Sequence, residues 1–225
     1  MSDRPTIKIC CIASVDEARM ALDAGAAVLG LVSHMPSGPG VISDELCAEI
    51  VAALLPSTQT FLLTSRVHAS DIVEQHARIR SSALQLVDHV PPEELRKLRH
   101  LCPGVRLVQV IHVLDDTAVA QAQAAAPWVD TILLDSGNPL LAVKELGGTG
   151  RVHDWATSRR IRDAVWPLPV FLAGGLNADN VAQAVAAVQP YGVDLCSSVR
   201  TLGALDAVKL GRFVGAVHLA ATPGP

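Results

Sequence analysis

The sequence predicts a single (β/α)8 TIM barrel, and two observations carry this prediction. Short apolar runs alternate eight times with Ala-rich segments of helical periodicity, at a spacing of roughly 20–30 residues. Glycine-rich segments follow the sixth and seventh runs, in the half of the chain where such barrels hold phosphate groups. One barrel takes roughly 200–250 residues, and the chain has 225 residues.

The predicted strands are continuous apolar runs, as expected when both faces of a parallel sheet are buried. We expect strands at Thr6–Cys10, Ala27–Ser33, Thr60–Thr64, Ala83–Val87, Arg106–Ile111, Thr131–Asp135, Val170–Ala173 and Gly192–Cys196. The helical segments are Val15–Ala24, Ser43–Leu54, Ala69–Ile79, Pro92–Leu101, Thr117–Ala126, Ser158–Ala164, Ala178–Val188 and Leu205–Leu219.

Several helices begin with recognisable capping residues. Ser14 stands three residues before Glu17, which is the capping-box pattern. Ser43 and Ser70 are also natural N-caps, and Asn177 precedes the seventh helix. These signals support the helix assignments independently of the apolar periodicity.

An open, doubly wound sheet is the structural alternative. It would place its glycine-rich loop after the first strand, where this chain has Cys10-Cys11. The barrel is therefore favoured. We expect one domain over residues 1–225, with residues 222–225 as a short loose tail.

Composition excludes several classes of partner. The net charge of −4 and an aromatic content of 3% give neither a basic surface nor stacking side chains for nucleic acid. The sequence has no signal-peptide pattern and no apolar run of the roughly 20 residues that span a membrane. The five cysteines are odd in number and lack Cys-x-x-Cys spacing, which indicates unpaired thiols and a cytoplasmic protein. The oligomeric state stays open.

Two strand ends carry candidate catalytic residues, because reactive groups in such barrels stand at the C-terminal ends of strands. Strand alternation puts Lys8 and Cys10 on one side, where the ammonium would favour a thiolate. The alternative for Cys10 is a small buried apolar residue. Asp135 ends an apolar strand, where a carboxylate is costly to bury without a partner or a task. The alternative for Asp135 is a helix cap or a loop hydrogen bond for Ser136-Gly137.

No metal or cofactor is expected. The eight histidines are scattered and show no ligand spacing, and the sequence has neither a P-loop nor a nucleophile elbow. Only His34, just after the second strand, is expected near a pocket.

Five groups of segments stand out together. They are Lys8-Ile9-Cys10; Leu133-Leu134-Asp135-Ser136; Gly147-Gly148-Thr149-Gly150 with Asp154-Trp155; Leu172-Ala173-Gly174-Gly175-Leu176-Asn177 with Asn180-Val181; and Pro190-Tyr191-Gly192-Val193-Asp194. As a set they resemble phosphoribosylanthranilate isomerase, a metal-free (β/α)8 enzyme family of tryptophan biosynthesis. The resemblance runs from the first strand to the eighth and is strongest from Asp130 to Ser198.

The resemblance implies an Amadori aldose–ketose isomerisation of a phosphoribosylated arylamine. Asp135 resembles the general acid that opens the furanose ring, and Cys10 resembles the general base that removes the C2 proton. The partner is then a phosphorylated small molecule. The residues expected around its phosphate are Gly148, Gly150, Gly174, Gly175, Ser197 and Ser198.

The chain also departs from the family pattern. The family has an Arg that holds the anthranilate carboxylate, where this chain has Ser37-Gly38-Pro39-Gly40. Gly usually follows the catalytic Cys, but here Cys11 does, and we expect its side chain to point away from the barrel interior. Gln-Leu-His-Gly becomes Gln85-Leu86-Val87-Asp88, and Ser-Ser-Gly-Val-Glu becomes Ser197-Ser198-Val199-Arg200.

These departures leave the aglycone side open. The cations that could replace the missing Arg are His34, Arg66 and Arg200, and we expect Gly40→Arg to raise kcat/KM for an anthranilate substrate. Two alternatives remain beside the anthranilate isomerase. One is a paralogous isomerase acting on another phosphorylated aminosugar, and the other is a non-catalytic phosphosugar-binding barrel.

Overall fold

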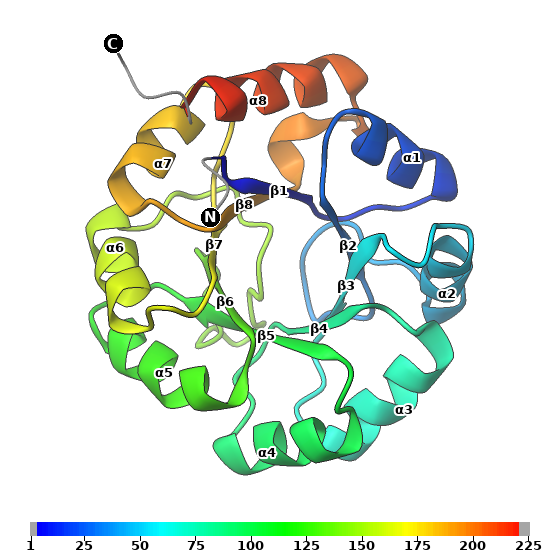
Figure 1. The fold of residues 1–225 in the computed structure, drawn as a ribbon, viewed down its shortest axis with the longest axis vertical. Coiled ribbons are helices and arrows are strands. Elements are labelled where there is room, and N and C mark those ends of the chain that lie inside the picture. The colour runs from blue at the N-terminus through cyan, green and yellow to red at the C-terminus, as the bar shows by residue number, and fades with distance from the viewer. Residues whose placement is uncertain (1–3, 221–225) are drawn as a thin grey trace.

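The computed structural model describes residues 4–220, so the predicted tail at residues 222–225 lies outside the described residues. Eight parallel strands form a closed barrel in chain order, with β8 paired to β1. Figure 1 shows the strands as an inner ring and the helices as an outer ring around them. The predicted (β/α)8 barrel is therefore confirmed, and the open doubly wound sheet is excluded.

The barrel strands and helices alternate along the described chain, and a two-stranded hairpin lies between β8 and α8. The barrel strands are β1 (Thr6–Ile9), β2 (Val28–Val32), β3 (Gln59–Thr64), β4 (Ala83–Leu86), β5 (Arg106–His112), β6 (Thr131–Asp135), β7 (Val170–Leu172) and β8 (Gly192–Leu195). The helices are α1 (Val15–Asp23), α2 (Asp44–Ala52), α3 (Ala69–Ile79), α4 (Pro92–Leu101), α5 (Thr117–Ala125), α6 (Trp155–Ala164), α7 (Val181–Val188) and α8 (Ala207–Ala220). Short elements complete the set: the 3₁₀ helices η1 (Ala126–Trp128) and η2 (Ser197–Val199), and the hairpin strands β9 (Arg200–Thr201) and β10 (Ala204–Leu205).

Side-chain caps account for two of the helix starts that the sequence predicts. The hydroxyl of Ser14 accepts a hydrogen bond from the N–H of Glu17, and that of Ser43 accepts one from Leu46. Both N-cap predictions are confirmed. The Glu17 carboxylate returns to the N–H of Ala13, one residue before the position that a capping box predicts.

The starts of α6 and α7 differ from the prediction because other polar side chains act there, and α3 starts as predicted but without the predicted N-cap Ser70. Asp154 accepts hydrogen bonds from two N–H groups of the first turn, so α6 begins at Trp155 and not at Ser158. Asn177 instead accepts from the N–H groups of Asp179 and Asn180, and this turn delays α7 to Val181. The N-cap of α3 is His68, which places Ser70 inside the helix.

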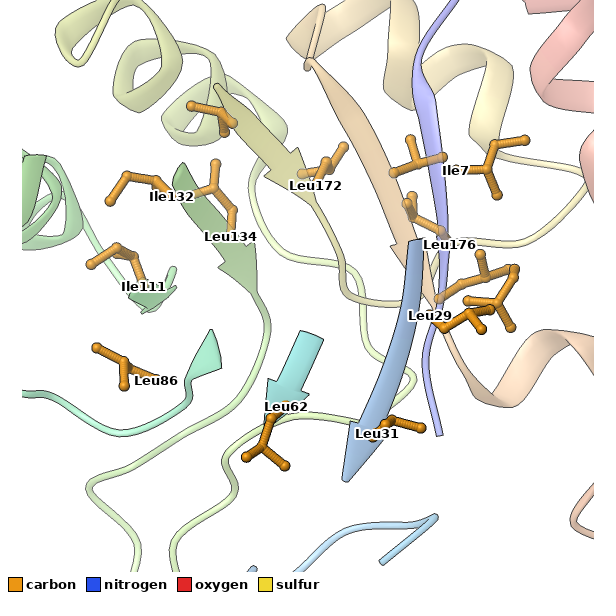
Figure 2. Packing of buried hydrophobic residues seen from close by; sticks show 14 of the residues in the cluster. Ile7, Leu29, Leu31, Leu62, Leu86, Ile111, Ile132, Leu134, Leu172 and Leu176 are labelled. Atoms are coloured by element: carbon orange, nitrogen blue, oxygen red, sulfur yellow. The ribbon is translucent and has the colours of Figure 1, made fainter. Parts of the chain in front are cut away.

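Strand alternation divides the buried apolar side chains into two layers. One layer, shown in part in Figure 2, includes Leu29 and Leu31 of β2 and packs between the strands and the helices. The other includes Val28 and Val32 of the same strand and fills the barrel interior. Because successive side chains of a strand point to opposite faces, each strand contributes to both layers. In the described part of the chain, no helix is long and apolar enough to cross a membrane.

Candidate active site

A pocket of about 780 Å³, open to solvent, lies at the C-terminal ends of the barrel strands. Its floor is the apolar interior layer, represented by Leu63, Val110 and Leu133. Its rim is formed by loops that follow β1, β2, β6, β7 and β8. Both candidate catalytic residues, Cys10 and Asp135, line this one pocket. The position agrees with the general rule for barrel enzymes.

Cys10 belongs to a buried charge cluster just beyond the end of β1. Lys8 is fully buried, and its Nζ lies 2.9 Å from Oδ1 of Asp194 on β8 and 5.8 Å from the ring centroid of Phe61. The strand register brings Lys8 directly opposite Asp194. A buried ammonium needs such a partner, because its unpaired desolvation would cost several kcal/mol.

Gly30 of β2 makes room for this cluster. A Cβ at Gly30 would lie 2.8 Å from the Cys10 sulfur and 3.0 Å from the Lys8 Nζ. Both groups therefore approach the same point of the β2 backbone, which only glycine leaves free. The predicted proximity of Lys8 to Cys10 is confirmed.

Opposed effects act on the Cys10 thiol. Burial raises its pKa to about 11, and the charge of Asp194 adds to this effect. The Lys8 ammonium and the N–H of Cys11 lower the pKa, but they do not offset burial. Lys8 therefore acts in the predicted direction, toward the thiolate, and burial outweighs it.

Asp135 ends β6 with a carboxyl group that is 7% exposed. Burial raises its pKa above the ordinary range, and the charge of Asp194 acts in the same direction. The N–H of Ser136 and the charges of His112 and Lys8 act against this rise. The carboxyl Oδ2 lies 2.8 Å from the point where Gly147 would carry a Cβ, so glycine at that position leaves space beside the acid.

Glycines with left-handed backbone also line the pocket. Gly148 (φ +68°), Gly150 (φ +69°), Gly174 (φ +81°) and Gly175 (φ +63°) all line it, as does Ser197. A Cβ at Gly175 would lie 2.7 Å from the backbone carbon of Arg151, so both conformation and space require glycine there. Such turns expose backbone N–H groups, which is how anions are held without a charged side chain. Ser198 is set apart from the others, because its hydroxyl is buried and does not line the pocket.

Two loops meet over the pocket. The Ser37 hydroxyl, on the loop after β2, donates a 2.6 Å hydrogen bond to the carbonyl oxygen of Lys144 on the loop after β6. A Cβ at Gly148 would lie 2.5 Å from Cδ of Pro39. The loop after β2 is thus in direct contact with the glycine-rich loop after β6.

Comparison with known proteins places this arrangement in a family. A sequence model described as N-(5'-phosphoribosyl)anthranilate (PRA) isomerase matches residues 7–216. N-(5'-Phosphoribosyl)anthranilate isomerase of Haloferax volcanii is 37% identical over 221 residues, covering 95% of this chain and 93% of its own. The enzyme of Methanocella arvoryzae is 34% identical over 193 residues, covering 86% and 88%. The chain belongs to the phosphoribosylanthranilate isomerase family.

Solved structures of the family share this fold. Phosphoribosylanthranilate isomerase from Thermotoga maritima superposes with a TM-score of 0.81 at 26% identity, covering 95% of this chain and 98% of its own. A second phosphoribosylanthranilate isomerase, solved in complex with reduced 1-(o-carboxyphenylamino)-1-deoxyribulose 5-phosphate, gives a TM-score of 0.79 at 24% identity and the same coverage.

Cys11, which replaces the usual glycine of phosphoribosylanthranilate isomerases, does not point where alternation predicts. Its φ is +62°, a left-handed conformation that glycine adopts without strain. Because β1 ends at Ile9, strand alternation does not extend to residue 11. The side chain turns into the pocket, so the prediction that it points away from the barrel interior is wrong.

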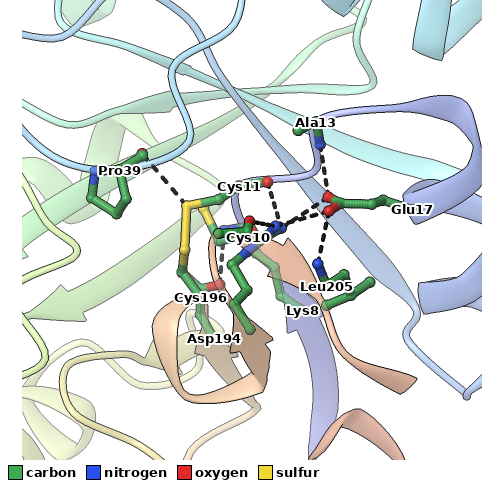
Figure 3. Close-up of a disulfide and its surroundings, with 11 residues drawn as sticks. Lys8, Cys10, Cys11, Ala13, Glu17, Pro39, Asp194, Cys196 and Leu205 are labelled. Carbon is green, nitrogen blue, oxygen red and sulfur yellow. Dashed lines mark hydrogen bonds and ion pairs between the residues drawn. A yellow bond between two sulfur atoms is a disulfide. The ribbon is translucent and has the colours of Figure 1, made fainter. Parts of the chain in front are cut away.

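Cys11 and Cys196 form a disulfide that joins the segments after β1 and β8 (Figure 3). The expectation that all five cysteines are unpaired is therefore wrong for this pair. Cys10, Cys47 and Cys102 are free and buried. A pairing between residues 185 positions apart has no local sequence signal. An odd number of cysteines also gives no indication that two of them pair.

Cys11 and Gly40 are two departures from the phosphoribosylanthranilate isomerase pattern, and they compensate for each other in side-chain volume. A Cβ at Gly40 would lie 2.4 Å from the Cβ of Cys11, and the φ of Gly40 is +76°. Cys11 thus fills the space beside a glycine that stands where the family has its carboxylate-binding Arg. The expectation that Gly40→Arg raises kcat/KM for an anthranilate substrate stays a prediction, and the new side chain would meet Cys11.

The structure does not bring the three predicted aglycone cations to the pocket. His34 and Arg66 are exposed, and neither lines it. Arg200 is turned toward Glu17 and the backbone after β1. Among the described residues, no Lys or Arg lines the pocket.

The sequence patterns did not identify two residues of the pocket, Asp194 and Gln85. Asp194 lies within a recognised segment but was given no role, although it is a carboxylate near the end of a strand, the same signal that identified Asp135. Gln85 lines the pocket, and its Oε1 is buried without a hydrogen-bond partner. A polar residue in the apolar run of β4 was the signal for Gln85.

Proposed function

We propose that this protein catalyses the Amadori rearrangement of N-(5'-phosphoribosyl)anthranilate, the isomerase step of tryptophan biosynthesis. The observation that carries the proposal is the layout of the pocket. Cys10, Asp135 and glycine turns suited to a phosphate all line this one pocket. Membership of the phosphoribosylanthranilate isomerase family supports the same reaction.

Asp135 acts as the general acid in this proposal. It donates a proton to the furanose ring oxygen, the C1–O bond breaks, and the ring opens to a protonated Schiff base. Burial raises the pKa of Asp135, which keeps the carboxyl protonated at higher pH than a surface aspartate. A general acid whose pKa lies close to the working pH is the most effective.

Cys10 acts as the general base. Its thiolate removes the proton from C2, and the electron pair of that C–H bond forms the enolamine, which tautomerises to the ketone. With a pKa of about 11, roughly one Cys10 in a thousand carries the thiolate at pH 8. The Lys8 ammonium faces the sulfur and stabilises this minor form.

The phosphate is held by backbone N–H groups around Gly148, Gly150, Gly174, Gly175 and Ser197, in our proposal. Ser198 is the weakest of the predicted phosphate residues, since its hydroxyl is buried away from the pocket. The aglycone lies against the apolar wall that includes Val32, Leu63 and Val110. Gln85 is the polar group available on that wall.

One observation favours a second candidate. Because no Lys or Arg of the described chain lines the pocket, an anthranilate carboxylate has no direct ion-pair partner there. A paralogous isomerase with a different arylamine or amine substrate would meet this condition. The anthranilate reaction stays the better supported one, since relatives up to 37% identical carry that name.

The assay of the purified protein with N-(5'-phosphoribosyl)anthranilate separates these candidates. Loss of substrate fluorescence with a kcat/KM above roughly 10⁴ M⁻¹s⁻¹, the lower end of ordinary enzymes, supports the anthranilate isomerase. A value several orders of magnitude lower supports the paralogue, and binding of the substrate without turnover would support a non-catalytic barrel.

Domain organisation and compartment stay predictions. We propose that the chain forms one domain and acts in the cytoplasm on a phosphorylated small molecule. Stable disulfides are rare in a reducing cytoplasm, so the disulfide between Cys11 and Cys196 argues against this compartment.

A further inference from the structure

Arg200 is a nearly buried cation beside the pocket. It begins β9 after η2, and its side chain is 9% exposed. Its Nη1 lies 3.0 Å from Oε1 of Glu17 and its Nη2 lies 3.1 Å from Oε2, so the two side chains form a bidentate pair. This geometry fixes the plane of the guanidinium.

Glu17 is itself held in place. It accepts hydrogen bonds from the N–H groups of Ala13 and Leu205 as well as from Arg200. Burial alone would raise the pKa of Glu17, but these hydrogen bonds outweigh it and lower the pKa. The carboxylate is therefore a charged anchor for Arg200, at the start of α1.

The guanidinium also faces the turn that follows β1. Its Nη2 donates to the carbonyl oxygen of Cys11 and lies 3.4 Å from that of Cys10. These carbonyl groups flank the left-handed residue 11, whose φ is +62°. A non-glycine residue in this conformation persists only where its surroundings hold it.

One rigid peptide group joins Arg200 to the reactive sulfur. The carbonyl of Cys10 and the N–H of Cys11 belong to the same planar unit. That N–H acts on the Cys10 side chain and lowers the pKa of its thiol. A cation at the oxygen end of the unit polarises it and fixes the direction of its N–H.

We propose that Arg200 is a positioning residue for the reaction: by binding the carbonyl groups of Cys10 and Cys11, it fixes the turn that carries the Cys10 side chain. The inference rests on the proposed role of Cys10 as the base. The family pattern has Glu where this chain has Arg200, so the inference concerns this chain.

The test compares Arg200→Met with the wild-type protein by two readouts. The first is the rate at which iodoacetamide alkylates Cys10 at pH 8.5, followed by mass spectrometry of its peptide, which needs no substrate. We expect this rate to fall about threefold or more, since the thiolate is the reactive form. The second is turnover, where kcat should fall about tenfold while KM stays within about threefold.

Arg212→Met is the matched control. Arg212 lies on α8, is 69% exposed and pairs with Asp179, so neither readout should change. If Arg200→Met does not fold, Arg200→Lys decides, because one ammonium cannot reach both oxygens of Glu17 and the two carbonyl groups. Its alkylation rate should fall below the wild-type rate.

A wild-type alkylation rate in a folded Arg200 variant would overturn the inference. So would a faster rate, which would show that Arg200 only shields the thiol. Failure of the proposed function is distinguishable, since the wild-type protein would then lack isomerase activity while alkylation of Cys10 still depended on Arg200.

Discussion

The two sides of the pocket differ in what they keep of the family pattern. The side built by β6, β7 and β8 keeps the buried acid and the left-handed glycines, and its spacing matches the motifs that the sequence displays. On the side built by β1 and β2, Cys11 stands where the family pattern has a glycine, and Gly40 stands where it has an arginine. A phosphate site depends on backbone conformation, which tolerates little change. An aglycone site depends on side-chain volume, which two compensating substitutions can rebuild.

The largest expected effects concern the acid and the base, one from each side. Cys10→Ala and Asp135→Asn should each lower kcat by about 10²–10⁴-fold, because each removes a positioned proton donor or acceptor. Steady-state assays with N-(5'-phosphoribosyl)anthranilate measure this, and circular dichroism controls for folding. Near-normal turnover in either variant would remove that residue from the mechanism.

The disulfide gives the next largest effect. Cys196→Ser removes the covalent link between the segments after β1 and β8, and it should lower the free energy of unfolding by about 2–4 kcal/mol. Denaturant unfolding without reductant measures the loss. Reductant should bring the wild-type midpoint down to that of the variant and leave the variant unchanged. A wild-type midpoint insensitive to reductant would contradict the link.

The volume exchange on the β1–β2 side predicts a coupled pair. Gly40→Arg should cost about 2–3 kcal/mol of stability in the native background, from overpacking against Cys11 and backbone strain. In a Cys11→Gly background the same change should cost only about 1 kcal/mol, and there the new cation should raise kcat/KM for the anthranilate substrate. Each cost is measured against its own background by denaturant unfolding. Equal costs in both backgrounds would refute the exchange.

The glycine side predicts a smaller effect confined to binding. Gly175→Ala should raise KM about tenfold with little change in kcat, because a Cβ there meets the backbone of Arg151 and strains a left-handed turn. Gly211→Ala on α8 is the control, since a Cβ there meets nothing within 4 Å. Steady-state kinetics of both variants show whether the effect is local. An unchanged KM in Gly175→Ala would argue against the phosphate assignment.

Most of the fold was predictable because it follows from local pattern. Buried parallel strands appear as apolar runs, and Ser14 and Ser43 identify two helix starts by residue type alone. Asp135 and the glycines were predictable for the same reason, since strand ends and left-handed turns restrict which residues fit. The retained side of the pocket is therefore visible in the sequence.

The rest could not be predicted because it depends on contacts between distant segments. The inward turn of Cys11 needs the left-handed φ that follows β1, and its bond to Cys196 joins opposite ends of the chain. Arg200 looked available for a substrate carboxylate, but the fold brings Glu17 to it. Burial outweighs the ammonium of Lys8 at Cys10, a balance that composition and spacing do not express.

The pH dependence of Asp135→Asn tests the acid–base assignment most directly. With the acid removed, the residual kcat/KM should follow the thiolate of Cys10 alone, whose pKa is about 11. It should therefore rise about tenfold per pH unit from pH 7 to 9.5. In the wild-type protein this rise should stop above the pKa of Asp135. There, a higher pH increases the thiolate fraction of Cys10 and decreases the protonated fraction of Asp135 by the same factor. A pH-independent residual activity in Asp135→Asn would contradict the role of Cys10 as the base.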